Sequence, residues 1–357
     1  MSPDYFSLNG GMEVALANPL DKPIRLSNVS SCGWKPGGTK TFRNKSSKIF
    51  DTFGTNLQNP SERMCRIHVP RKGYKFIQAD LAGAEALDVA MRTPRGGKFR
   101  QLFEYKIKPH TFVAMHLFQT QWQTETPYDC KHLCTLDIPQ LAEHPEWKLL
   151  SKLIKNNHER YFIGKKTCHS FNYLKMPGTF RFDVLKGSEG EIVLTLRDSE
   201  LFRGIYVGLF PEIFADWHEK VKADLEETRT IYNSLSYPHY FGGHVKNDKT
   251  IREAVATGPQ STVGCIANIA ACDMQDYIES SALHWDLLNN KHDSLLVQAP
   301  ADEALLAAKK LTEYMSRIEL CSPFGEKFFM KVEVAIGENW DKASDENPNG
   351  MKEVTLD

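Results

Sequence analysis

The stretch Tyr74-Lys-Phe-Ile-Gln-Ala-Asp80-Leu-Ala-Gly-Ala-Glu85 decides the fold of this chain. Its first seven residues are mainly apolar and follow Arg71-Lys-Gly73, a pattern typical of a short buried strand. Small residues come next, and Glu85-Ala-Leu-Asp-Val-Ala-Met91 then has the pattern of a helix. We therefore expect Asp80 at a junction between a strand and a helix.

A second aspartate, Asp293, lies more than two hundred residues later in Lys291-His-Asp-Ser294. The flanking segments 282–288 and 294–298 predict a hairpin with Asp293 at its bend. Phosphoryl transfer needs charge on a triphosphate to be neutralised, and two magnesium ions roughly 3.5–4 Å apart can do this. Because Mg²⁺ keeps water and substrate phosphate as ligands, two carboxylates and a backbone carbonyl suffice. The pair predicts a two-metal site; the alternative is two unrelated surface aspartates.

Between the two aspartates, Lys165, His169 and Tyr173 recur at intervals of four. One helical face would then carry a cation and two aromatic rings. These groups suit a nucleoside triphosphate, although a half-buried helix face is the simpler alternative.

The rest of the chain reads as strands around a helical block. Helices are expected at 110–117, 139–155, 159–174 and 211–235, with an irregular piece at 178–196. These are followed by a buried helix at 261–281, a helix at 302–320 and a strand at 328–336. Strands from both ends around helices predict an α+β fold. The expected division is a lead-in at 1–40, sheet parts at 41–98 and 239–357, and a helical part at 99–238.

The composition is that of an ordinary soluble protein, with 357 residues, 41% hydrophobic, 25% charged and a net charge of -1. Neither a run of eighteen apolar residues nor a signal peptide is visible, so a cytoplasmic protein is expected. Lys and Arg outnumber Asp and Glu by fourteen to five between Trp34 and Arg100, as in a cationic track. The eight cysteines are scattered, and only Cys130 and Cys134 are closely spaced, so reduced thiols and no structural zinc are expected.

Taken in order along the chain, six motifs resemble a family A DNA polymerase of the DNA polymerase I type, most of all a phage version. The resemblance spans residues 41–343, and its joint order makes it specific. The motifs are Thr55-Asn-Leu-Gln-Asn-Pro60, Asp80, the Lys165 helix, Arg252 to Gln260, His292-Asp293 and Val332 to Trp340. The resemblance implies an antiparallel-sheet palm with an inserted helical fingers subdomain. The family places a thumb, and often an exonuclease domain, before the Asn56 segment, and we expect both to be absent because the first 40 residues cannot hold either.

The resemblance also implies roles at the nucleotide and the metals. Asp80 and Asp293 would bind two Mg²⁺ ions together with the carbonyl of Leu81, and Glu85 would exclude a ribose 2'-hydroxyl. At the incoming nucleotide, the implied contacts are Lys165 to the triphosphate, His169 to the nucleotide, Tyr173 beside the template base, and Arg160 as a shifted phosphate contact.

Contacts to primer and template are implied as well, chiefly in the minor groove, where acceptors shared by all base pairs allow shape to be checked. His292 would support the primer end. The other implied contacts are Arg43, Asn56, Gln58, Arg252 and Gln260. Helix capping and turn formation are the alternative roles for these side chains.

Four departures from the family pattern predict a weakened or unusual enzyme. Tyr161 stands four residues before Lys165, where the family usually has arginine, and Ser294 follows Asp293, where glutamate is common. Leu174 replaces a customary glycine, and Ala82-Gly83-Ala84 replaces a more polar trio.

The function expected is that of a nucleotidyltransferase, a DNA-templated DNA polymerase that adds dNMP to a primer 3'-hydroxyl. Its partners would be primer-template DNA and dNTP. The thumb would come from a second polypeptide, as in a split polymerase, or the chain would be part of a longer product. Without a thumb, binding to DNA would be weak and salt-sensitive. The alternatives are a single-subunit RNA polymerase-like enzyme, against which Glu85 and Asn56-Leu-Gln-Asn59 argue, and a non-catalytic subunit that binds primer-template.

Overall fold

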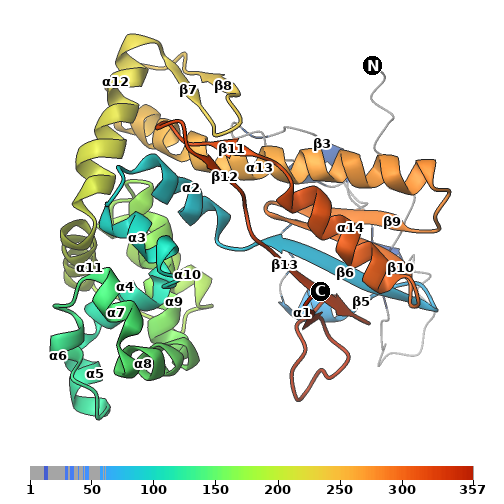
Figure 1. The fold of residues 1–357 in the computed structure, drawn as a ribbon, viewed down its shortest axis with the longest axis horizontal. Helices are drawn as coiled ribbons and strands as arrows, with labels where there is room; N and C mark the ends of the chain where they lie inside the picture. The colour runs from blue at the N-terminus through green and yellow to red at the C-terminus, as the bar shows by residue number, and fades with distance from the viewer. Residues whose placement is uncertain are drawn as a thin grey trace. The chain divides into compact units, whose positions relative to one another are not determined.

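The structure is a computed structural model and describes residues 12–14, 29–30, 33–35, 39, 43, 45–47, 57–58, 60 and 62–356. The chain forms two compact units, which are drawn in Figure 1. The sheet unit comprises Met1–Ala84, Gln260–Leu320 and Lys327–Asp357, and the helical unit comprises Glu85–Pro259 and Cys321–Glu326.

A five-stranded antiparallel sheet forms the centre of the sheet unit, with the strand order β14-β13-β6-β10-β9. The helix α14 (Ala304–Ser316) packs against β6, β10 and β13, and buries one face of the sheet. The strands are β6 (Tyr74–Leu81), β9 (Asp286–Lys291), β10 (Ser294–Pro300), β13 (Val332–Gly337) and β14 (Lys352–Glu353). β6 lies in the middle because consecutive residues, such as Phe76 and Ile77, bury apolar side chains on opposite faces of the sheet.

Smaller elements complete the sheet unit. β1 (Met12–Val14) pairs with β2 (Val29–Ser30) and β5 (His68–Val69), and β3 (Gly33–Lys35) pairs with β4 (Lys45–Ser47). The short helix α1 (Glu62–Arg66) precedes β5, and β11 (Leu320–Cys321) pairs with β12 (Lys327–Phe328).

Helices make up almost all of the helical unit, around one hydrophobic core. They are α2 (Ala84–Arg92), α3 (Lys98–Glu104), α4 (Pro109–Leu117), α5 (Gln119–Glu125), α6 (Cys130–Leu133), α7 (Ile138–Glu143), α8 (Pro145–Asn156), α9 (His158–Asn172), α10 (Pro177–Gly187), α11 (Leu196–Leu209), η2 (Ile213–His218) and α12 (Glu219–Glu227). A hairpin of β7 (Thr230–Tyr232) and β8 (Pro238–Tyr240) follows, and then α13 (Asp248–Ser280). No helix in the described part of the chain is both long and apolar enough to cross a membrane.

This arrangement confirms the α+β class, with an antiparallel sheet from both ends of the chain and an inserted helical block. β6, α2, α4 and α9 begin and end within about two residues of the expected positions. The hairpin of β9 and β10 is confirmed, with His292 and Asp293 as its two-residue turn, although β9 runs from Asp286 to Lys291 and not over 282–288. The lead-in at 1–40 lies mostly outside the described residues.

Two expected helices are wrong because the chain turns sharply inside them. The helix expected at 139–155 is broken into α7 and α8, since His144 is extended and Pro145 starts the second helix. The helix expected at 211–235 ends at Glu227, and Thr230–Tyr232 becomes a strand. Thr, Ile and Tyr favour strands, and pairing with β8 decides between the two states.

Three other expectations need correction. The irregular piece at 178–196 contains the helix α10, which begins at Pro177 in the favoured first position. α13 begins at Asp248, not near Ser261, and continues through Pro259. The final strand is interrupted, since β12 ends at Phe328 and β13 begins at Val332.

The two units divide at Ala84 and Pro259, whereas the helical part was expected at 99–238. The wider helical unit has a physical cause, because Val89 and Ala90 of α2 and Ala254 and Val255 of α13 are part of its core. The palm and fingers ranges remain predictions.

Gly164 is required by the close packing of α4 against α9. A Cβ atom at this position would lie 2.5 Å from the His110 carbonyl oxygen and 2.9 Å from Ala114 Cβ. We predict that Gly164→Ala lowers the free energy of unfolding by about 1–3 kcal/mol through overpacking. The control is Gly204→Ala on α11, where a Cβ meets no atom within 4 Å, and helix propensity alone raises stability by up to about 1 kcal/mol. Urea unfolding measures the stability of both variants. Equal changes in the free energy of unfolding would contradict the close packing of α4 against Gly164.

Candidate functional site

The sheet unit brings the two predicted aspartates close together, Asp80 near the end of β6 and Asp293 in the turn directly before β10. In the antiparallel pair of β6 and β10, Asp80 lies opposite Ser294, the residue after Asp293. The Leu81 N–H donates to the Asp293 carbonyl oxygen at 2.9 Å. Both aspartates are half-buried. Two residues 213 positions apart in sequence (293 minus 80) are therefore backbone neighbours.

The turn that carries Asp293 has an unusual backbone. His292 has a φ of 59°, in the left-handed region that non-glycine residues seldom occupy. The Asp293 N–H donates to the Lys291 carbonyl oxygen at 2.7 Å, which closes the turn. A strained two-residue turn costs of order 1–3 kcal/mol and persists where the surrounding structure determines it. Here the hydrogen-bonded pairing of β9 with β10 holds the turn in this conformation.

A third carboxylate, Glu333 on β13, lies opposite Asp80 in the register of the other neighbouring strand. Directly opposed residues share one face of a sheet, so Asp80, Ser294 and Glu333 lie on the same face. Sequence reasoning missed Glu333, although the alternation Val332-Glu-Val was visible. In the described part of the chain, no group of three or more His, Cys, Asp or Glu side chains is arranged to hold a metal ion. The two aspartates and a carbonyl remain a donor set of the kind that Mg²⁺ uses with substrate phosphate.

The predicted DNA contacts near the N-terminus are partly described. Gln58 is buried, its Nε2 donates to the Asn290 carbonyl oxygen at 3.1 Å, and its Oε1 accepts from the Ser46 N–H at 3.0 Å. This side chain therefore ties its segment to β9, three residues before Asp293. The Arg43 carbonyl oxygen accepts from the Thr39 N–H at 3.2 Å. Asn56 lies outside the described residues.

In the helical unit, three predicted nucleotide-site residues form one cluster. The Tyr173 hydroxyl donates to Glu85 Oε2 at 2.6 Å, and His169 Nδ1 lies 3.8 Å from the same oxygen. The rings of His169 and Tyr173 meet edge to face with centroids 5.5 Å apart. α2 thus presents Glu85 to the end of α9, and the positions of all three side chains depend on one another.

Lys165 lies one turn before His169 on α9 and is exposed. Beside both is His110 of α4, which sequence reasoning missed. Its ring packs against Tyr161 with centroids 6.0 Å apart. Burial, and then the charges of Lys165, His169 and Lys108, lower the pKa of His110 to about 4. His110 is therefore neutral at physiological pH and adds no charge next to Lys165.

Arg160 is not brought to this face of α9. Its guanidinium binds both oxygens of Glu125 at 2.7 Å and lies 4.4 Å from the ring centroid of Trp122. Tyr161, and not Arg160, shares the face of Lys165 and packs on His110. The two remaining predicted DNA contacts, Arg252 and Gln260, lie on α13 and are half-buried.

Comparison with known proteins gives two similarities. No protein-family model matches this chain. Over 95 residues it is 30% identical to DNA polymerase I of Chloroflexus aurantiacus, a match that covers 26% of this chain and 9% of that protein. A solved structure, the POL domain of Pol1 from M. smegmatis in complex with DNA primer-template and dNTP, matches with a TM-score of 0.60 and 17% identity. That match covers 87% of this chain and 48% of the other, so this chain spans about half of the solved structure. The chain therefore has the fold of a DNA polymerase I-like polymerase domain.

Buried histidines predict how stability depends on pH. Burial lowers the pKa of His110, His116 and His218 from 6.5 to about 4. Between these values the unfolded chain binds protons that the folded protein does not, so stability falls as pH falls from about 6.5 to 4 and is independent of these groups above that range. We predict that His110→Asn reduces the slope of unfolding free energy against pH, between pH 4 and 6.5, by about 1 kcal/mol per pH unit. Urea unfolding at several pH values measures this slope. The exposed His132→Asn is the control, and equal slopes in both variants would contradict the prediction.

Proposed function

We propose that the chain is a DNA-templated DNA polymerase that adds dNMP to a primer 3'-hydroxyl with release of pyrophosphate. The observation that carries this proposal is the pairing of β6 with β10, which makes Asp80 and Asp293 neighbours at adjacent strand ends. The polymerase-domain fold supports it. Family A membership and a phage-type version are part of the same proposal.

In the sheet unit, Asp80, Asp293 and the Leu81 carbonyl would hold two divalent metal ions, with Mg²⁺ as the expected ion. Such ions neutralise triphosphate charge and activate the attacking hydroxyl when bound. The protein's part is to hold two carboxylates at a fixed separation. The β6–β10 ladder supports this role because its backbone hydrogen bonds fix the backbone positions of both aspartates, so little backbone reorganisation would be needed when substrate binds.

In the helical unit, we propose that the cluster of Glu85, His169 and Tyr173 selects the sugar and the base. Glu85 would lie beneath the sugar and exclude a 2'-hydroxyl, and the bond from Tyr173 supports this role by orienting the carboxylate. His169 would pack on the incoming nucleotide, and Lys165 would contact its triphosphate. A lysine is suited to this task as a compact charge on a flexible stem.

For DNA, we propose contacts that read the minor groove and support the primer. His292 lies in the same turn as Asp293, a suitable position for the primer end. The proposed minor-groove contacts are Arg43, Asn56, Gln58, Arg252 and Gln260. We further propose that protein beyond the described elements, such as a second polypeptide, supplies the grip on duplex DNA.

Removing either aspartate tests the mechanism. We predict that Asp80→Asn and Asp293→Asn each lower the primer-extension rate with Mg²⁺ by about 10³-fold, because each loss removes several kcal/mol of charge stabilisation. The control is Asp302→Asn, an exposed aspartate between β10 and α14, which should retain full activity. Equal extension by all three variants would exclude the two-metal mechanism.

Sugar selection tests the cluster separately. We predict that Glu85→Ala raises incorporation of rNTP relative to dNTP by about 10- to 100-fold, because a pocket discriminates one small group by this order. Single-nucleotide incorporation on one template measures the ratio, with the exposed Glu226→Ala as control. Efficient use of rNTP by the unaltered protein would instead favour an RNA polymerase-like enzyme.

A further inference from the structure

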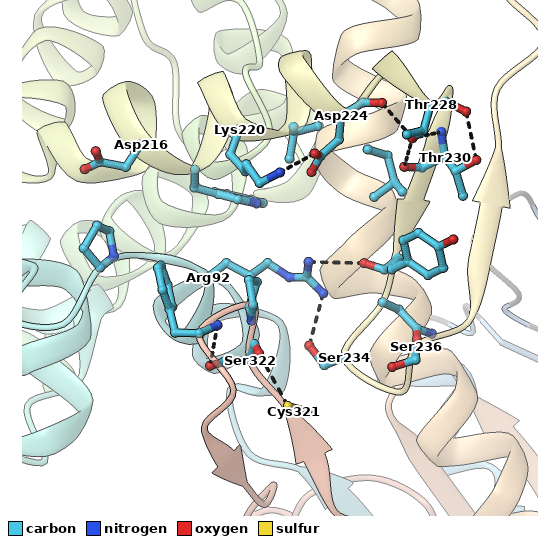
Figure 2. Close-up of a pocket in the computed structure, with 18 of the residues that line it drawn as sticks. Arg92, Asp216, Lys220, Asp224, Thr228, Thr230, Ser234, Ser236, Cys321 and Ser322 are labelled. Atoms are coloured by element: carbon cyan, nitrogen blue, oxygen red, sulfur yellow. Dashed lines mark hydrogen bonds and ion pairs between the residues drawn. The ribbon is translucent and has the colours of Figure 1, made fainter. Parts of the chain in front are cut away.

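The helical unit contains a cavity of about 720 Å³ apart from the Glu85 cluster. Figure 2 shows its walls: Asp216, Lys220 and Asp224 from η2 and α12 lie on one side, and Arg92, Ser234 and Ser322 lie on the other. The wall at Ser322 belongs to the loop between β11 and β12, which is held by a hydrogen bond of 2.9 Å from the Cys321 N–H to the Ser234 carbonyl oxygen. Cavities of 300–1,000 Å³ are the usual size for small-molecule sites.

A buried network fixes the floor of this cavity. Asp88 is fully buried, accepts from Arg92 Nε at 2.5 Å and from Ser234 Oγ at 2.5 Å. Arg92 Nη2 donates to Ser234 Oγ at 3.1 Å, and Nη1 donates to the Tyr232 carbonyl oxygen at 3.3 Å. A guanidinium has five N–H groups, so this one keeps donors beyond the three that these bonds use.

The charges of the cavity argue against a phosphate as its occupant. Two cations, Arg92 and Lys220, face two carboxylates, Asp216 and Asp224. Arg92 is ion-paired with Asp88, and Lys220 is ion-paired with Asp224. Because the site has no net positive charge, it would not offset the free-energy cost of removing a phosphate group from water. A neutral ligand with hydrogen-bonding groups fits better.

Aromatic side chains supply the other half of the chemistry. Tyr232 and Phe324 line the cavity and are 56% and 49% exposed, which leaves their rings open for stacking. Trp217 also lines the cavity and is only 3% exposed. Its indole Nε1 has no hydrogen-bond partner among the described residues. The Trp217 ring forms a buried part of the cavity wall.

We propose that this cavity binds one nucleobase of a single-stranded nucleic acid. A base is planar, uncharged and edged with donors and acceptors, which matches stacking on Tyr232 or Phe324 and hydrogen bonds to the Arg92 and Ser234 side of the cavity. The cavity opens to solvent, so the sugar and phosphate stay outside and need no cationic pocket. The choice of a nucleic acid rests on the proposed function, while the cavity itself is distinct from the proposed polymerase residues.

The indole of Trp217 provides a direct readout. Titration of the full chain with dT12 should quench its tryptophan fluorescence, and Trp217→Phe should abolish most of the quenching. The double variant Tyr232→Leu/Phe324→Leu should weaken binding by about 10-fold or more, the effect of losing a stacking platform. The matched control Tyr105→Leu, at an exposed tyrosine after α3, should bind as the unaltered protein does. Circular dichroism checks that each variant is folded.

Titrations with other ligands identify whether the bound base belongs to a strand or to a free nucleoside. Tight binding of dT12 with weak binding of thymidine and dTMP supports a strand, whereas equal binding of thymidine assigns the cavity to a free nucleoside. Quenching by inorganic phosphate alone, or unchanged dT12 affinity in Tyr232→Leu/Phe324→Leu, overturns the proposal. Preference for a synthetic peptide over dT12 would assign the surface to a protein partner and also overturn it. In the double variant Asp80→Asn/Asp293→Asn, dT12 should still quench tryptophan fluorescence as it does in the unaltered protein. A failure of the polymerase assignment is therefore distinguishable from a failure of the proposed base-binding cavity.

Discussion

The antiparallel ladder between β6 and β10 is the constraint on which the proposed site depends. Its register runs from Ser294 opposite Asp80 to Pro300 opposite Tyr74. Side chains alternate between the faces of a sheet, so a slip of one residue would move Asp80 to the opposite face. Apolar residues on both faces, such as Phe76 and Ala79, oppose such a slip because each face is packed. Core packing and the placement of the two carboxylates are therefore set by the same hydrogen bonds.

The short helix α2 has a comparable role in the helical unit. Its first turn places Glu85 against Tyr173 of the α9 end, and its last two turns place Asp88 and Arg92 against Ser234. Gly258 of α13 packs on the same guanidinium, since a Cβ there would lie 2.7 Å from Arg92 Cζ. One helix of nine residues thus positions both the proposed sugar-selecting cluster and the floor of the cavity.

The sequence pattern predicted those strands, helices and residue spacings that are determined by neighbouring residues. The strand at Tyr74, the helix at Glu85 and the recurrence of Lys165, His169 and Tyr173 were visible because periodicity and small residues mark them. Contacts between distant segments were not visible in one sequence. Glu333 reaches Asp80 only through sheet register, and His110 reaches Lys165 only through the packing of α4 on α9. The hairpin at Thr230 likewise depends on its partner strand, and this is why a helix was expected there.

Metal binding measured without catalysis tests the central claim most directly. Electron paramagnetic resonance of Mn²⁺ titrated into the protein with a non-hydrolysable dNTP should show bound ions in the unaltered chain. The double variant Asp80→Asn/Asp293→Asn should lose them, whereas Asp302→Asn should keep them. Equal Mn²⁺ binding by the double variant would show that these two carboxylates hold no metal, and would contradict the account.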